Sequence, residues 1–190
     1  MTWLYSRVSI PNLQAIQDEL ISVYAVMNAN NLGVRRSALY TNFFAADLQP
    51  LVPKLAEFLQ SHNLLCRLQR CMFVNADVRI PNRIHIDSTN MSVLYSLNIP
   101  LVDCSGTYTA FYKPLDVVPS RNGSYLLAVD ESAAIEIDRV ECIYPVLVNT
   151  SIPHVGISDK PLRQMACIRF YPELTCDEAN QLVSMPPASL

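Results

Sequence analysis

The pattern of apolar residues changes near residue 64, and this change constrains the fold more than any other feature of the sequence. After it, short runs rich in Val, Ile, Tyr, Phe and Thr alternate with Pro, Asn, Asp and Ser, as in short strands joined by turns. No helical periodicity separates the runs, so they predict an antiparallel sandwich or barrel rather than alternating βαβ units. The expected strands are Leu65–Val74, Arg83–Ile86, Val93–Ile99, Thr107–Tyr112, Tyr125–Val129, Ala134–Glu136, Val146–Val148 and Gln164–Phe170.

Before residue 64 the sequence predicts helices that cover a sheet. Apolar residues recur at three- and four-residue steps from Leu13 to Met27, after a start signal at Pro11-Asn12. A second helix is expected over Pro50 to His62, with Asp47 as its N-cap. A capping box from Thr175 to Glu178 predicts a last short helix. The apolar stripe expected on the second helix consists of Leu51, Leu55, Phe58 and Leu59.

The length of 190 residues suits a single domain of the α+β class that is mainly β. Residues 1–63 are expected to form a helical N-terminal layer, residues 64–174 a barrel-like β core, and residues 175–190 a short helix and tail. Hydrophobic residues make up 51% of the chain, which excludes disorder as its dominant state.

Charge and cysteine content exclude several classes of protein. The net charge of −3 argues against a global electrostatic attraction to nucleic acid or anionic lipid. No apolar stretch reaches the roughly 18 residues of a membrane span, and the N-terminus lacks the pattern of a secretory signal. The six cysteines include no pair with CxxC spacing, so we expect reduced thiols and a cytoplasmic protein.

Two of the three histidines fall in a pattern that suits a metal centre. His85 and Asp87 are two residues apart in an extended segment, so their side chains share a face, and His154 follows 69 residues later at the junction of two strands. Two imidazoles and one carboxylate form the facial triad that suits non-haem Fe(II), with three coordination positions left open. Taken alone, His-x-Asp is also the pattern of an ordinary pair on a strand.

The strand after His154 gives this pattern its weight. Arg163 begins the run, and alternation places Arg163, Met165, Cys167 and Arg169 on one face. A guanidinium on the inner face of a barrel needs an anion to balance its charge. A dicarboxylate held on the metal would supply one, because arginine binds a carboxylate through two parallel N–H groups.

The array of His85, Asp87, His154 and Arg163 resembles the Fe(II)/2-oxoglutarate-dependent dioxygenases over about residues 70–173. The nine-residue spacing from His154 to Arg163 is typical of the prolyl and other hydroxylase branches. The segments Leu97–Pro100 and Phe170–Leu174 resemble the aspartyl/asparaginyl β-hydroxylase group. The resemblance implies a double-stranded β-helix, a jelly-roll or cupin-like core, with the N-terminal helices packed on one sheet.

The resemblance also implies roles for individual residues. His85, Asp87 and His154 would be the catalytic iron ligands, and Arg163 would bind the distal carboxylate of 2-oxoglutarate. The implied cofactors are Fe(II), 2-oxoglutarate and O₂, with ascorbate as a reductant. The implied activity is hydroxylation of a C–H bond in a peptide side chain, an amino acid or a small metabolite, with succinate and CO₂ as co-products. The residues expected to offer a second contact to that carboxylate are Ser92, Ser96 and Asn98.

The sequence leaves three alternatives open. Arg163 and Arg169 have the Arg-x5-Arg spacing of AlkB-like nucleic-acid dealkylases, but the Asn-x-Tyr of that family is absent. An inactive β-helix that serves as a binding or structural subunit is the second. The third is a metal cupin without 2-oxoglutarate, in which Arg163 would pair with a protein acid such as Glu136 or Asp138. The arginines that would line a nucleic-acid groove are Arg67, Arg70, Arg79 and Arg83. The sequence does not determine the oligomeric state.

The segment from Lys113 to Arg139 lies between the two parts of the metal motif. Members of the superfamily carry their substrate-selecting segment here, and prolines and a glycine within it predict a loop. Its residues do not name a substrate.

Overall fold

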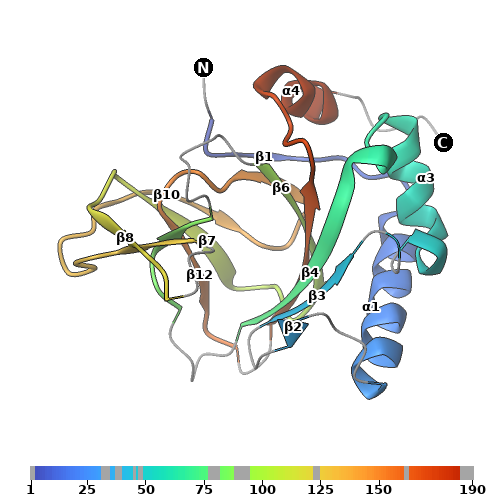
Figure 1. Cartoon of the computed structure of the whole chain (residues 1–190), viewed down its shortest axis with the longest axis horizontal. Coiled ribbons are helices and arrows are strands. Elements are labelled where there is room, and N and C mark those ends of the chain that lie inside the picture. Colours follow the sequence, from blue (N-terminus) through green and yellow to red (C-terminus); the bar gives the residue numbers. More distant parts are fainter. Residues whose placement is uncertain are drawn as a thin grey trace.

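Two antiparallel sheets form the centre of the molecule (Figure 1). The computed structural model describes residues 3–30, 35–36, 40–44, 46, 49–76, 82–87, 95–121, 125–160 and 163–184. Within them, the major sheet has the order β1 (Tyr5–Arg7), β11 (Val146–Asn149), β6 (Tyr95–Val102), β13 (Arg163–Phe170), β4 (Leu68–Ala76), β3 (Tyr40–Phe44) and β2 (Arg35–Arg36). The minor sheet has the order β10 (Glu136–Glu141), β7 (Thr107–Tyr112), β12 (His154–Ser158), β5 (His85–Ile86), β9 (Leu126–Ala128) and β8 (Val117–Pro119).

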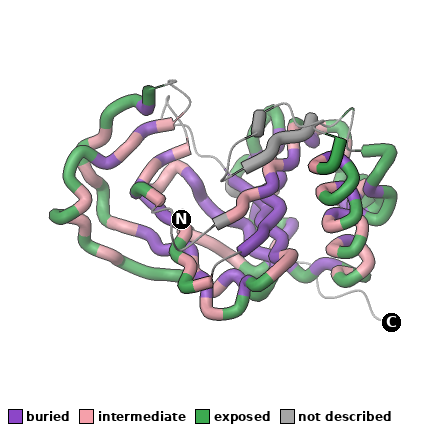
Figure 2. The backbone as a smooth tube through the Cα atoms, turned by 90° about the horizontal axis from the view of Figure 1, so that it is seen from below, coloured by how far each residue is buried: buried purple, intermediate pink, exposed green. Residues whose placement is uncertain are grey.

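Helices cover the outer face of the major sheet. The long helix α1 (Leu13–Ala29) and the shorter α3 (Pro53–Ser61) lie side by side next to β3 and β4, and α4 (Cys176–Ser184) packs near the other end of the sheet (Figure 1). Figure 2 shows buried residues concentrated in the strands and on the inward side of these helices. The predicted stripe of α1 is confirmed, because its buried residues are Ile16, Leu20, Val23 and Met27.

Strand alternation gives the major sheet two different faces. On β13, Ala166 and Ile168 point outward and join the core under the helices. Met165 and Cys167 point toward the minor sheet and cluster with Cys142. The inner face of the sheet is therefore free to carry the polar groups of a site, while the outer face supplies the main core. The described thiols Cys66, Cys71, Cys104, Cys142 and Cys167 are free.

The N-terminal part expected to form a helical layer contains α1 and α3 but is not entirely helical. Strands β1, β2 and β3 also come from this part of the chain and extend both edges of the major sheet. The second helix begins at Pro53 after Val52, not after Asp47, which lies outside the described residues. Leu51 sits in a short 3-10 turn and is 48% exposed, so it does not belong to the apolar stripe with Leu55, Phe58 and Leu59.

The strand predictions differ in accuracy. The expected Thr107–Tyr112 matches β7, and the strands expected near residues 68, 95, 146 and 164 appear with shifted ends. The strand expected at Ala134–Glu136 begins only at Glu136 and continues to Glu141. The expected strands include neither β8 nor β12, although β12 begins at His154, where the junction of two strands is expected.

The capping box at the C-terminal helix is confirmed. The backbone N–H of Thr175 donates to the Glu178 carboxylate at 2.8 Å, and the backbone N–H of Glu178 donates to the Thr175 hydroxyl at 3.3 Å. Arg67 ties this end of the chain to the start of β4 by donating to the carbonyl of Pro172 at 2.8 Å. None of the helices in the described ranges is long and apolar enough to cross a membrane.

Candidate metal centre

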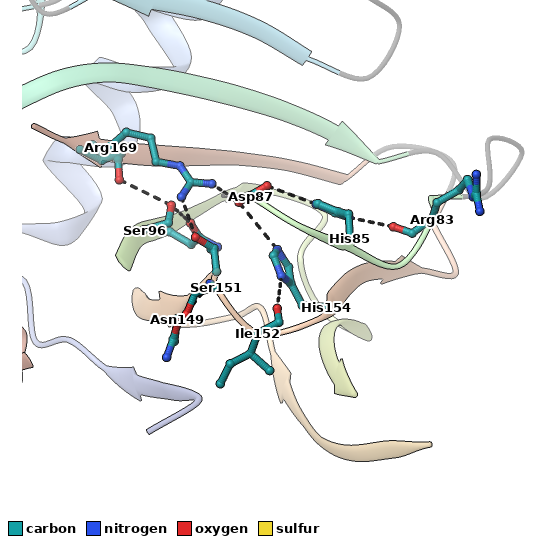
Figure 3. A network of polar contacts seen from close by, with 12 residues as sticks. Arg83, His85, Asp87, Ser96, Asn149, Ser151, Ile152, His154 and Arg169 are labelled. Atoms are coloured by element: carbon teal, nitrogen blue, oxygen red, sulfur yellow. Dashed lines mark hydrogen bonds and ion pairs between the residues drawn. The ribbon is translucent and has the colours of Figure 1, made fainter. Parts of the chain in front are cut away.

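Three predicted ligand residues converge at the inner face of the minor sheet (Figure 3). His85 and His154 are directly paired across β5 and β12, so their side chains lie on the same face. Their ring centroids are 4.5 Å apart. Asp87 follows β5, with 3.5 Å between its Oδ1 and Nε2 of His85 and 3.8 Å between its Oδ2 and Nε2 of His154. Ligand atoms of all three residues lie within 4.8 Å of one another.

Backbone carbonyls fix the orientation of both imidazoles. Nδ1 of His85 lies 2.7 Å from the carbonyl oxygen of Arg83, and Nδ1 of His154 lies 2.8 Å from that of Ile152. A carbonyl only accepts, so each Nδ1 must carry the proton that it donates. This tautomer leaves the lone pair of each Nε2 free and directed at the point shared with Asp87, which is the arrangement found in metal-binding histidines.

Asp87 is held by Arg169 and Thr150. The Arg169 guanidinium forms an ion pair with Oδ2 of Asp87 and donates to the Thr150 hydroxyl at 2.9 Å. The backbone N–H of Asp87 donates to the Thr150 carbonyl at 3.0 Å. Burial alone would raise the pKa of Asp87, but Arg169 and the two histidines outweigh it and hold that pKa well below its ordinary value. The carboxylate therefore stays ionised and can act as a ligand.

His154 is kept neutral by its surroundings. Its side chain is buried on the inner face of the minor sheet, and this desolvation lowers the pKa of His154 to about 4. Metal binding requires the neutral imidazole, so His154 is ready to bind a cation throughout the neutral pH range. Two imidazoles and one fixed carboxylate fit a divalent transition metal and leave the remaining coordination positions open.

Arg163 reaches across the space between the two sheets. It begins β13 on the major sheet and is only 4% exposed. Its Nη1 lies so close to Gly156 of β12 that a Cβ added to this glycine would be 3.0 Å from it. The guanidinium contacts two sulfur atoms, with 3.2 Å from Nη2 to Sγ of Cys142 and 3.1 Å from Nε to Sδ of Met165. Burial raises the pKa of Cys167 to about 12, so this neighbouring thiol supplies no negative charge.

No carboxylate in the described ranges forms an ion pair with Arg163. The acids named as alternative partners bind elsewhere: Glu136 accepts two hydrogen bonds from Arg139, and Asp138 accepts one from the Arg139 backbone. Gly156 and His154 are two residues apart on one face of β12, which corresponds to roughly 7 Å along the strand. The Arg163 guanidinium is thus a buried cation within a small dicarboxylate's length of the triad.

Of the residues expected to assist Arg163, the structure describes Ser96 and Asn98. Ser92 lies outside the described residues. Ser96 donates to Oδ1 of Asn98 at 2.7 Å, and Asn98 is paired with Cys167, four residues along β13 from Arg163. Thr109 is a closer hydroxyl that sequence reasoning missed. It is paired with Gly156, and its Oγ1 is 3.7 Å from Sγ of Cys142, the atom that Arg163 contacts.

The role of Arg169 was also missed. Alternation correctly placed it on the inner face, but nothing local in the sequence indicates that it meets Asp87. Of the arginines expected to line a nucleic-acid groove, Arg67 and Arg83 are engaged in separate contacts. Arg67 binds the segment before α4, Arg83 donates to Glu131 and to the Ala128 carbonyl, and Arg79 lies outside the described residues.

Acid should destabilise the metal-free protein through His154. The unfolded imidazole takes up a proton near pH 6.5, whereas the folded one does so only near pH 4. Unfolded protein therefore binds more protons between these values, and the free energy of unfolding should fall by up to about 3 kcal/mol as the pH drops through this window. Urea titrations in EDTA at several pH values measure this loss. Equal slopes for His154→Gln and the parent protein would contradict the assignment.

Replacing Arg169 should weaken metal binding. Without the guanidinium, Asp87 loses the contact that orients it, and loss of such a contact typically lowers metal affinity about 10- to 100-fold. Co(II) absorption titrations of Arg169→Met measure the effect. Arg169→Lys keeps the positive charge and serves as a second variant in case Arg169→Met unfolds. Arg139→Met is the matched control, since Arg139 binds Glu136 at the surface. Tighter Co(II) binding in Arg169→Met would instead show that Arg169 competes with the metal.

Comparisons with known proteins bear on the fold. No protein-family model matches the chain, and no curated protein matches it. Among solved structures, the epimerase SnoN in complex with Fe3+, alpha ketoglutarate and nogalamycin RO is similar, with a TM-score of 0.53 and 13% identity over 98% of this chain and 87% of that one. EvdO2 from Micromonospora carbonacea var. aurantiaca has a TM-score of 0.47 and 15% sequence identity over 87% of this chain and 86% of that one. The likeness to SnoN shows a shared fold.

Proposed function

We propose that the protein is a non-haem Fe(II)/2-oxoglutarate-dependent oxygenase of the double-stranded β-helix type. The observation that carries this proposal is the buried guanidinium of Arg163, which faces no acid of the described chain and lies close to the triad of His85, Asp87 and His154. A buried cation without a counter-charge is destabilising, so a bound organic anion would relieve it. The similar SnoN structure contains iron and alpha ketoglutarate, which supports the same pair of ligands here.

Each residue has a defined part in this proposal. Bound iron, 2-oxoglutarate and O₂ together supply the oxidising power, with ascorbate as an external reductant and with succinate and CO₂ as co-products. His85, His154 and Asp87 hold the metal on one side and leave the other side open. Arg163 binds the distal carboxylate, and the Thr109 hydroxyl is the nearest candidate for a second contact. Arg169 keeps Asp87 ionised and oriented.

The proposed outcome is hydroxylation of a C–H bond in a peptide side chain, an amino acid or a small metabolite. We propose that the chain acts as a single domain in the cytoplasm, and that nucleic acid is not its substrate because Arg67 and Arg83, two of the candidate arginines, bind other parts of the protein. The prolyl or aspartyl/asparaginyl hydroxylase branch is a narrower proposal that rests on the spacing from His154 to Arg163. An assay should score cosubstrate turnover separately from product, since SnoN is an epimerase.

Succinate formation tests the proposal. Protein supplied with Fe(II), ascorbate, O₂ and 2-oxoglutarate should release succinate even without a substrate, and His85→Ala or His154→Ala should abolish this release. Arg163→Met should raise the half-saturating 2-oxoglutarate concentration roughly 100-fold, since a charged hydrogen bond and a buried cation are both lost. Arg139→Met removes an exposed guanidinium and should behave like the parent protein. Absence of succinate under all conditions would favour the inactive subunit.

Gly156→Ala should separate cosubstrate binding from metal binding. The added methyl would lie 3.0 Å from Nη1 of Arg163, so the guanidinium must move by a few tenths of an ångström. We expect a roughly several-fold higher requirement for 2-oxoglutarate, by the sensitivity of catalysis to small displacements. Co(II) affinity should not change, because the three atoms nearest the added methyl belong to Arg163 and Asn82 and not to a ligand residue. Ser158→Ala on the same strand is the control, and a loss of Co(II) affinity in Gly156→Ala would contradict this separation.

A further inference from the structure

A single row of side chains crosses the minor sheet through the metal centre. Register pairs His154 with His85, His85 with Leu127 of β9, and Leu127 with Val118 of β8. On the other side, His154 is paired with Phe111 of β7. Directly paired residues on antiparallel strands share a face, so these five side chains lie on the face that carries the triad.

The two sides of this row differ in their exposure to solvent. Phe111 is fully buried and stacks on Tyr5 with 5.7 Å between ring centroids, so the row is closed beyond His154. On the opposite side, Val118 is 48% exposed and Leu127 is half-buried. Solvent therefore reaches the triad from the side of β9 and β8.

On β5 and β9 the opposite face is not the exposed one, whereas the edge strand β8 is partly exposed on both faces. Ile86, Leu126 and Ala128 point away from the triad and are buried. Leu115 and Ala134, from the connecting segments, pack against the cluster that contains Ala128. A short ribbon at the edge of a sheet would normally turn its apolar side to the core and its polar side to water. Here apolar side chains remain on the accessible side, next to the metal centre.

The surface of this row beyond His85 is uncharged. Leu127 and Val118 carry no polar group, and Tyr125, two residues before Leu127, places its ring edge-on to His85 with 5.8 Å between centroids. The nearby guanidinium of Arg83 is turned to the Ala128 carbonyl at 2.8 Å and to Glu131 at 2.7 Å. A charged ligand on this row would lose hydration without gaining a counter-charge from these residues, whereas an apolar one would gain by burial.

We propose that Leu127 and Val118 form the floor of the substrate site, and that the substrate is a neutral organic molecule with an apolar ring or aliphatic face. Strands are roughly 5 Å apart, so the floor extends about 10 Å from His85, the length of two to three fused rings. The inference rests on the proposed function and narrows its substrate to this class. It excludes free charged amino acids and nucleic acid.

Binding of N-phenyl-1-naphthylamine, a neutral fused-ring fluorophore, tests the floor without any catalysis. Fluorescence titration of the metal-free protein should show binding, and Val118→Glu should weaken it about tenfold, since an apolar contact is replaced by a charge. Val26→Glu is the matched control, because Val26 is 58% exposed on α1, away from the triad. Leu127→Gln is a second variant in case Val118→Glu unfolds, as monitored by circular dichroism.

A paramagnetic metal locates the bound probe. Mn(II) held by the triad should broaden the proton resonances of bound N-phenyl-1-naphthylamine, and His154→Ala should remove the broadening. Unchanged probe affinity in Val118→Glu and Leu127→Gln, or a probe that Mn(II) bound at the triad does not broaden, would overturn the floor. A protein that binds the probe in the expected way but binds no Mn(II) would contradict the proposed function and leave the apolar site standing.

Discussion

The charge balance around Asp87 is the interaction on which the rest of the site depends. A buried carboxylate is stable only when it is paired and hydrogen-bonded, and Arg169 supplies the positive charge while Thr150 binds both partners. Arg169 belongs to the major sheet and Asp87 follows a strand of the minor sheet, so the same ion pair also joins the two sheets. The metal ligand and the packing of the sheets are thus held by one contact.

Strand β13 shows how one sequence can serve both core and site. Its outward residues, Ala166 and Ile168, pack under the helices, while its inward residues are an arginine at each end with two sulfur-bearing side chains between them. The two arginines lie at opposite ends of the strand and both cross to the minor sheet, where Arg169 meets Asp87 and Arg163 meets Gly156. One end of the strand therefore lies beside the metal-binding carboxylate, and the other carries the cation that has no acidic partner among the described residues.

Local pattern was sufficient to place His85 and Asp87 on one face and to predict the inner face of β13, because both follow from period-two alternation along the chain. His154 lies on another strand and was assigned through the family resemblance. It was not sufficient for contacts that depend on register between distant strands. The pairing of Thr109 with Gly156 and the meeting of Arg169 with Asp87 join residues that are 47 and 82 positions apart. The strands of the first third were missed for a related reason. β1 is only three residues long and is stabilised by pairing with β11, a contact that the sequence around β1 does not indicate.

The asymmetry of the row through the histidines has a simple physical origin. On one side, β1 places Tyr5 over Phe111, so the major sheet closes the space beyond His154. On the other side, β9 and β8 extend the minor sheet past β5 and keep their accessible apolar groups on the face of the triad. Apolar surface left accessible to water carries an unfavourable free energy, and on a stable fold such surface commonly marks a site that a ligand covers. Both β8 and β9 lie within the segment from Lys113 to Arg139, between the two parts of the metal motif. Substitutions in this segment can therefore alter the floor without disturbing the metal ligands or Arg163.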